Sequence, residues 1–214
     1  MRKYGTCFFE QYAQITLATL LGDEFDRLEN KDRPDLQSPD GHSLGIEVTR
    51  AMDESKNAEN ELLLDMAGVT GSRKYKDTLE EILENGYAFG LDEGGRIGVK
   101  EVLYWKMALP MRRILESKVS KVGNGFYGQF DKMGLFVFSK EDLEEVDAIK
   151  TMNFTIGLQK YQQNRYNRLY LADVNDLFVC NLDDGLQATS RLSRYPISQA
   201  QRTYFYHQAL ARQE

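Results

Sequence analysis

The stretch RPDLQSPDGHSLGIEVT, residues 33–49, decides the fold because it has the pattern of a β-hairpin. Its centre, residues 39–42 (PDGH), is rich in residues that turns favour, and we assign Asp40 to this turn. The flanking segments 33–38 and 43–50 are then expected to form two antiparallel strands. Side chains alternate along the second strand, with Leu44, Ile46 and Val48 on one face and Gly45, Glu47 and Thr49 on the other.

Two carboxylates are expected to face each other across this hairpin. With the turn centred near Gly41, Asp35 lies opposite Glu47, on the face away from the apolar residues. Opposed residues have Cβ atoms about 4.5–5.5 Å apart, and two carboxylates at that distance raise each other's pKa. A divalent cation removes the conflict, and Mg²⁺ prefers such oxygen ligands. The other interpretation is a polar face that is simply exposed to water, and a slip of one residue in the register would separate the pair.

The rest of the chain predicts helices and strands that build on the hairpin. Helices are expected over residues 6–21, 54–67, 77–85, 99–122 (interrupted near Pro110), 140–149 and 197–212. Strands are expected over residues 135–139, 168–172 and 176–180. No internal repeat or linker is visible, so we expect one domain over residues 1–214. The predicted class is α/β, with a central mixed β-sheet flanked by helices.

This arrangement resembles the core of the PD-(D/E)XK nuclease superfamily, the restriction-endonuclease-like fold. The residues that carry the resemblance are Glu10 on the first helix, Pro34-Asp35 on one strand and residues 46–49 (IEVT) on the next. The family pattern is helix, three strands, helix, strand, with the two acids on adjacent strands. The resemblance covers the core motif, residues 6–70, and extends loosely into residues 71–214.

The resemblance implies a metal-dependent nuclease that hydrolyses phosphodiester bonds. Its metal ligands would be Asp35, Glu47 and the main-chain carbonyl of Val48, with Glu10 as a third acid. Glu24 and Glu29 are weaker substitutes for Glu10. The implied cofactor is Mg²⁺, with Mn²⁺ as the other candidate ion. The implied partner is nucleic acid, DNA ahead of RNA, and a homodimer is an option because many such nucleases pair to cut two strands.

The family's lysine is missing, because Thr49 stands at its position. A threonine hydroxyl can position water, but it carries no positive charge to stabilise the transition state. Other candidate cations are Arg50, which faces the wrong way, Lys56, and Lys118 with Lys121 one turn further on. Lys118 borders the apolar face of its helix, where the stem of a lysine can also simply cover core surface.

Two hypotheses follow from the missing lysine. In the first, Lys118 or a neighbour supplies the charge and catalysis is retained. In the second, the nuclease-like fold is catalytically inactive and acts as a binding or regulatory module. A lysine ammonium within about 6 Å of the two acids would favour the first hypothesis.

The charge of the chain excludes a tight, nonspecific coat on DNA. The formal net charge is −6, from 27 Lys and Arg against 33 Asp and Glu. Residues 1–68 hold 14 of the acids and only 7 of the bases, so the remainder is close to neutral. Basic residues interleaved with aromatic ones over residues 96–121, 160–170 and 191–212 suit phosphate contact and base stacking, and suit an ordinary helix surface equally well.

Cysteine and hydropathy patterns indicate the cellular setting. Cys7 and Cys180 are too few for a disulfide framework, which favours a cytoplasmic protein. No stretch approaches the roughly 18 apolar residues of a membrane span, so no membrane association is expected. His42 and His207 are too far apart in the sequence to form a metal-binding motif.

Overall fold

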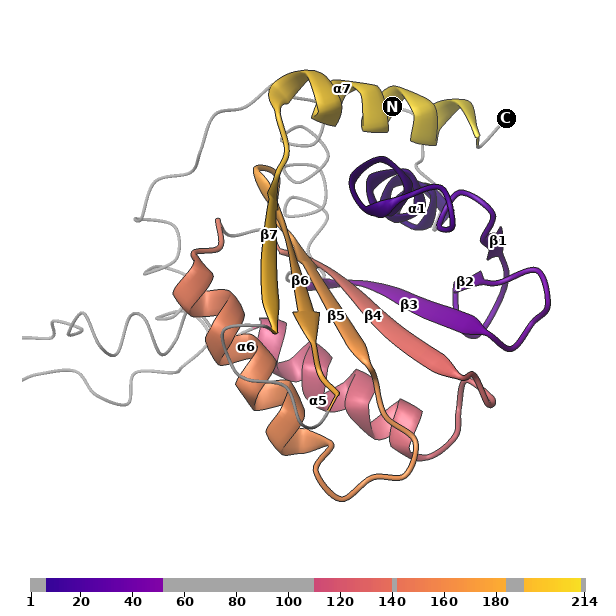
Figure 1. Ribbon diagram of the computed structural model, residues 1–214, viewed down its shortest axis with the longest axis vertical. Helices are drawn as coiled ribbons and strands as arrows, with labels where there is room; N and C mark the ends of the chain where they lie inside the picture. The colour runs from indigo at the N-terminus through magenta and orange to yellow at the C-terminus, as the bar shows by residue number, and fades with distance from the viewer. Residues whose placement is uncertain (1–6, 52–109, 140–141, 184–190, 213–214) are drawn as a thin grey trace, which may run out of the picture.

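A seven-stranded mixed sheet lies between two pairs of helices in the computed structural model, which describes residues 7–51, 110–139, 142–183 and 191–212 (Figure 1). The helices are α1 (Cys7–Leu21), α5 (Pro110–Gly123), α6 (Glu145–Leu158) and α7 (Gln199–Ala211). The strands are β1 (Glu29–Asn30), β2 (Leu36–Gln37), β3 (Leu44–Ala51), β4 (Lys132–Ser139), β5 (Arg168–Ala172), β6 (Asp176–Asn181) and β7 (Leu192–Pro196). Within the described ranges, no helix is both long and apolar enough to cross a membrane.

The strands lie side by side in the order of the chain. The neighbouring pairs β1–β2 and β2–β3 are antiparallel, β3–β4 and β4–β5 are parallel, and β5–β6 and β6–β7 are again antiparallel. Helices α5 and α6 precede β4 and β5, and both cover the same face of the sheet (Figure 1). This confirms the predicted α/β class with a mixed sheet flanked by helices.

The register of the first hairpin agrees with the prediction. Leu36 pairs with Ile46 and Gln37 pairs with Gly45. The pairing ends at Leu36, and one further step of this register would place Asp35 across from Glu47.

The first strand of this hairpin is shorter than predicted, because residues 33–35 bend instead of pairing. Pro34 has no N–H to donate to a ladder, and Arg33 has a φ of 63°. Gly45 allows this bend to lie close to β3, since a Cβ there would be 2.7 Å from Pro34 Cγ. The glycine therefore lets the segment that carries Asp35 approach the strand that carries Glu47.

Asp40 is a turn residue, as predicted. Its carboxylate accepts hydrogen bonds from the Ser38 hydroxyl at 2.6 Å and from the backbone N–H groups of His42 and Ser43 at 3.0 Å each. The Ser43 hydroxyl also donates to it. These hydrogen bonds to the charged form hold the pKa of Asp40 well below its usual value.

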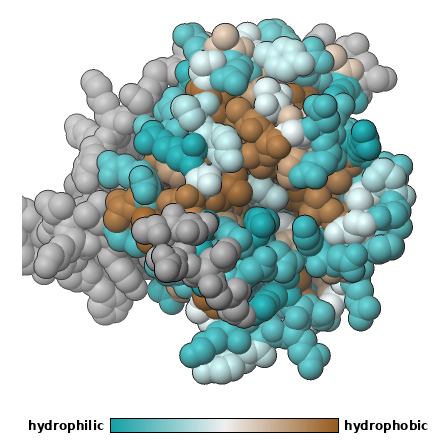
Figure 2. Space-filling view, in the orientation of Figure 1, coloured by the Kyte–Doolittle hydropathy of each residue, from teal (hydrophilic) through white to brown (hydrophobic). Residues whose placement is uncertain are grey.

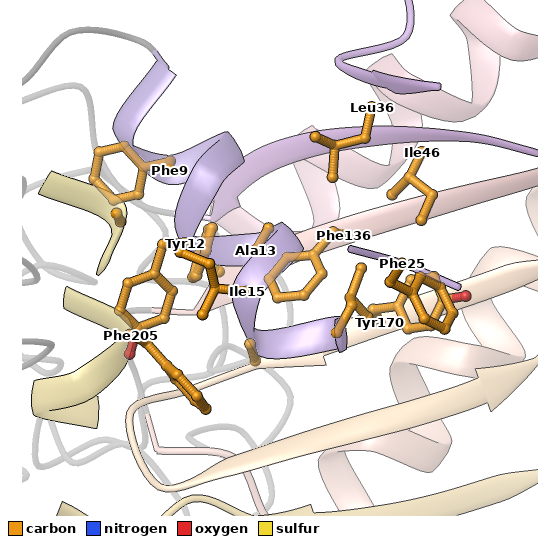
Figure 3. Close-up of a cluster of buried hydrophobic side chains, with 14 of the residues drawn as sticks. Phe9, Tyr12, Ala13, Ile15, Phe25, Leu36, Ile46, Phe136, Tyr170 and Phe205 are labelled. Carbon is orange, nitrogen blue, oxygen red and sulfur yellow. The ribbon is translucent and has the colours of Figure 1, made fainter. Parts of the chain in front are cut away.

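Each face of the sheet has its own hydrophobic core. The first core lies between the sheet and helices α1 and α7, where aromatic rings such as Tyr12, Phe136 and Phe205 pack together (Figure 3). The second core lies under α5 and α6 and includes Leu115, Leu135 and Tyr166. Figure 2 shows apolar side chains in the middle of the viewed face, surrounded by hydrophilic ones. Because β3 contributes to both cores, its register is strongly specified.

Several predicted elements are confirmed, and the bounds of one are wrong. Helix α1 ends before Gly22 (φ 134°), and the hairpin of β5 and β6 and the C-terminal helix also follow the prediction. The bounds predicted for the helix 140–149 are wrong, because α6 extends over Glu145–Leu158. Glu144 is the N-cap of α6 and makes a capping box with Asp147. Strands β1 and β7 were not predicted.

The part of the predicted helix 99–122 that follows the proline is confirmed, because α5 covers Pro110–Gly123. The predicted helices 54–67 and 77–85, and residues 99–109 of the third, lie outside the described residues.

Candidate functional site

The predicted acids lie near each other where β2 begins, beside the middle of β3. Glu47 is only 7% exposed in the middle of β3, and Asp35 is half-buried just before β2. The backbone N–H of Val48 donates a hydrogen bond to Asp35 Oδ2 at 2.7 Å. Since the N–H and C=O of one residue in an antiparallel pair point to the same neighbour, the Val48 carbonyl faces the same side of β3. The three predicted metal-binding groups therefore come from the middle of β3 and the residue just before β2.

Lys118 reaches this site from α5. Its Nζ lies 2.5 Å from Glu47 Oε1, and the two side chains are 14% and 9% exposed. Helix α5 is fixed by Leu115, Val119 and Val122, which are buried against the sheet. The ammonium is therefore in direct contact with Glu47, and its charge also lowers the pKa of Asp35, so a positive charge lies beside the acids although Thr49 replaces the motif lysine.

The environment of Asp35 favours its protonated form. Burial raises the pKa of Asp35 to about 7, and the charge of Glu47 adds to the effect. The hydrogen bond from Val48 and the charge of Lys118 act in the opposite direction. A cation beside Asp35 would stabilise the charged form of the carboxyl group, because it offsets both the cost of burying the charge and the repulsion by Glu47.

Glu10 turns toward the same region. Its Oε2 accepts a hydrogen bond from Asn30 Nδ2 at 2.6 Å, and burial raises its pKa, with smaller effects from the charges of Glu47 and Asp32. Glu24 is exposed, and Glu29 pairs with Lys31 at 2.7 Å. Among the described residues, no three His, Cys, Asp or Glu side chains are arranged as a ready metal site. The candidate ligands of the predicted Mg²⁺ site are therefore two carboxylates and a carbonyl.

The other predicted cations and Thr49 occupy different places. Thr49 is half-buried and lies two residues beyond Glu47, on the same face of β3. Arg50 lies on the opposite face, where its guanidinium is 4.5 Å from the centre of the Phe9 ring, as predicted. The ammonium of Lys121 lies 5.3 Å from the centre of the Phe126 ring. Lys56 is outside the described residues.

Tyr127 and Tyr166 lie close to Glu47, and the sequence did not predict this position for either residue. The hydroxyl of Tyr127 is buried and makes no well-formed hydrogen bond within the described residues. Burial raises the pKa of Tyr127, and the negative charge of Glu47 raises it further. The Tyr166 hydroxyl donates to the backbone carbonyl of Lys118 at 3.4 Å. Tyr127 follows a glycine-rich turn in the sequence, and no spacing rule connects that turn to Glu47.

The predicted basic and aromatic groups are only partly on the surface. Tyr166, Tyr170 and Phe205 are buried, so they form neither a base-stacking surface nor an exposed helix surface, the two interpretations that the sequence left open. Large aromatic rings on these strands and helices complete the two cores and leave only some neighbours exposed. Arg194 is committed to Asp176 through two hydrogen bonds of 2.8 and 2.7 Å, and Arg212 pairs with Asp26 at 2.9 Å. Tyr161 and Tyr204 remain exposed.

Comparison with known proteins identifies no relative of this chain. No family model matches the chain, and neither a curated protein nor a solved structure matches it.

In metal-free buffer, we expect the free energy of unfolding to fall as the pH rises from about 4 to about 7. The pKa of Asp35 is raised from 3.8 to about 7 in the folded protein, so the folded state binds more protons than the unfolded chain in this window. Stability decreases with pH wherever the folded state binds the extra proton. Asp173, whose pKa burial raises to about 6, acts in the same direction. Urea unfolding at a series of pH values measures the slope.

The variant Asp35→Asn tests this assignment. It removes one of the titrating groups, so the fall in stability should become shallower while the contribution of Asp173 remains. An Asp35→Asn slope equal to that of the unaltered protein would show that Asp35 does not titrate in this window.

Proposed function

We propose that this protein is a metal-dependent nuclease with a restriction-endonuclease-like core, which hydrolyses phosphodiester bonds in DNA in preference to RNA. The observation that carries the proposal is the 2.5 Å contact between Lys118 Nζ and Glu47 Oε1, next to Asp35. Through this contact a lysine ammonium lies beside the two acids, although Thr49 stands at the lysine position of the motif.

The order of the elements supports the proposed core. In the described residues, a helix is followed by three strands that pair antiparallel in turn, and after residues 52–109, which are not described, by a helix and a fourth strand that pairs in parallel with the third. Asp35 and Glu47 lie at adjacent strands of this unit, as the resemblance implies. Strands β5, β6 and β7 with helix α7 extend the sheet beyond it.

The oxygen groups of the site suit a hard divalent cation. Asp35, Glu47 and the Val48 carbonyl would hold Mg²⁺ or Mn²⁺, with Glu10 close enough for its charge to be felt by Asp35. The bound ion would lower the pKa of a water molecule and neutralise phosphate charge. Lys118 and Thr49 would then orient the nucleic acid and the attacking water.

Lys118 and Thr49 have complementary roles in the proposed reaction. The Lys118 ammonium provides a positive charge for the phosphate oxygens, where negative charge develops in the transition state. The Thr49 hydroxyl, on the same face as Glu47, can hydrogen-bond water but cannot replace that charge. In the absence of a cation, Lys118 also neutralises Glu47 and so limits its repulsion of Asp35.

The second candidate function is a catalytically inactive binding or regulatory module. The same ion pair favours it, because Lys118 already satisfies Glu47 without a metal ion. Such a module requires no affinity for Mg²⁺ that depends on Asp35. Metal titration therefore separates the two functions.

The proposal is tested with purified protein, linear and circular DNA, and RNA, in Mg²⁺, Mn²⁺ or EDTA. We expect cleavage products with either metal and none in EDTA, together with metal binding seen by calorimetry. Absence of cleavage on every substrate, or cleavage that continues in EDTA, would contradict the nuclease. Nucleic-acid binding without cleavage or metal affinity would favour the binding module.

A further inference from the structure

An exposed aromatic ring lies between two cations near the candidate site. Phe126 is 46% exposed, so its ring is accessible to a ligand. The guanidinium carbon of Arg33 and the ammonium of Lys121 each lie 5.3 Å from the centre of its ring. The ring packs edge to face on Tyr127, with 5.2 Å between the centroids.

The three residues of this cluster come from the segments that build the candidate site. Arg33 stands two residues before Asp35, and Lys121 lies nearly one turn after Lys118 on α5. Tyr127, the support of the ring, is close enough to Glu47 for that carboxylate to raise its pKa. The exposed ring is therefore a neighbour of the acids.

This chemistry matches an unpaired nucleotide. A nucleobase stacks on an aromatic side chain, and the adjacent phosphates bind the cations that flank it. Base stacking is stronger than a cation–π contact at an exposed site, so a base can displace a cation from the ring. The displaced cation stays within reach of a neighbouring phosphate. A base inside a duplex is already stacked on both faces and gains nothing from the ring.

The surroundings of Arg33 leave it available for this role. Its partner is Asp32 at 3.1 Å, and the side chains of the pair are 56% and 80% exposed. An ion pair this exposed to water contributes little, so a phosphate can compete with it.

We propose that Phe126, Arg33 and Lys121 form a subsite for an unpaired nucleotide beside Asp35 and Glu47. The protein then prefers single-stranded or frayed nucleic acid to a closed duplex. The proposal rests on the proposed function for its ligand class, nucleic acid, but it does not require cleavage.

Fluorescence anisotropy in EDTA tests the subsite without catalysis. The probes are a labelled oligo-dT of roughly 12 nucleotides, an oligo-rU of the same length, and a duplex of the same length. We expect the single strands to bind more tightly than the duplex. The variant Phe126→Ala should weaken single-strand binding by about 5- to 100-fold, as the loss of one stacked base does, whereas Phe126→Trp should retain it.

Tyr161→Ala is the matched control. Tyr161 is a 90% exposed ring with one lysine, Lys160, 5.3 Å from its centre, and it lies in the segment after α6. Its removal should leave binding unchanged. Equal losses in Phe126→Ala and Tyr161→Ala, an equal loss of duplex binding, or no binding of either single strand would overturn the subsite. The oligo-rU arm shows whether RNA shares it, and Phe126-dependent binding by a protein that cleaves nothing would refute the nuclease alone.

Discussion

The variant Asp35→Asn is expected to lose the metal-dependent cleavage activity. Asparagine keeps an oxygen that can accept the hydrogen bond from Val48 N–H, now 2.7 Å from Asp35 Oδ2, but it carries no charge for a cation. The loss in initial rate should exceed about 100-fold, because removing even an outer partner of a metal ligand commonly costs about 10- to 100-fold. The measurement is the initial rate of DNA cleavage in Mg²⁺, together with Mg²⁺ affinity by calorimetry.

The matched control for Asp35→Asn is Glu24→Gln. Glu24 is an exposed acid in the turn after α1, and the same change in charge there should leave the rate unchanged. Stability provides a second check, since Asp35→Asn removes repulsion by Glu47 and should not destabilise the metal-free protein near neutral pH. A folded Asp35→Asn protein that cleaves at the normal rate would remove Asp35 from the site.

The variant Lys118→Met is expected to change cleavage and metal binding in opposite directions. The cleavage rate should fall by about 100-fold or more, as it does when one group that stabilises transition-state charge is removed. Mg²⁺ should bind more tightly, because the ammonium that lies 2.5 Å from Glu47 Oε1 no longer competes for that oxygen. Single-turnover rates and calorimetric titration measure the two effects separately.

Two further variants serve as controls for Lys118→Met. Lys132→Met removes an exposed lysine at the start of β4 and should leave both quantities unchanged. Lys118→Met also leaves the buried carboxylate of Glu47 without its partner, so stability should fall, and Glu47→Gln/Lys118→Met should recover much of it. A folded Lys118→Met protein with a normal cleavage rate would show that Lys118 is only a counter-ion of Glu47.

The first hairpin was predictable because its signals are local. The turn residues 39–42 and the alternation of apolar side chains along residues 44–48 together set which residue faces which. The observed pairing of Leu36 with Ile46 follows from them. The helix before the hairpin was predictable for the same reason, since its apolar period and its terminal Gly22 are both visible in the chain.

Elements whose character depends on distant partners were less predictable. Strands β1 and β7 have too few buried apolar residues to give a clear alternation, and they exist because β2 and β6 offer them open edges. Tyr166 and Tyr170 looked like a basic and aromatic surface, but Tyr166 is buried in the core under α5 and α6, and Tyr170 is buried in the core on the opposite face of the sheet. Burial of an amphipathic side chain depends on what packs over it, and short-range spacing does not contain that information.

The sequence by itself determined that Asp35 and Glu47 face each other, because turn chemistry and strand periodicity act over a few residues. Only the tertiary structure decided which cation stands beside them. Lys118 is 71 positions away from Glu47 in the chain, and it arrives there because the apolar face of α5 packs on the sheet beneath β3 and β4. Packing of this kind depends on the shape of the whole core, so a lysine at the edge of a helix face becomes a partner of Glu47 only when the fold is complete.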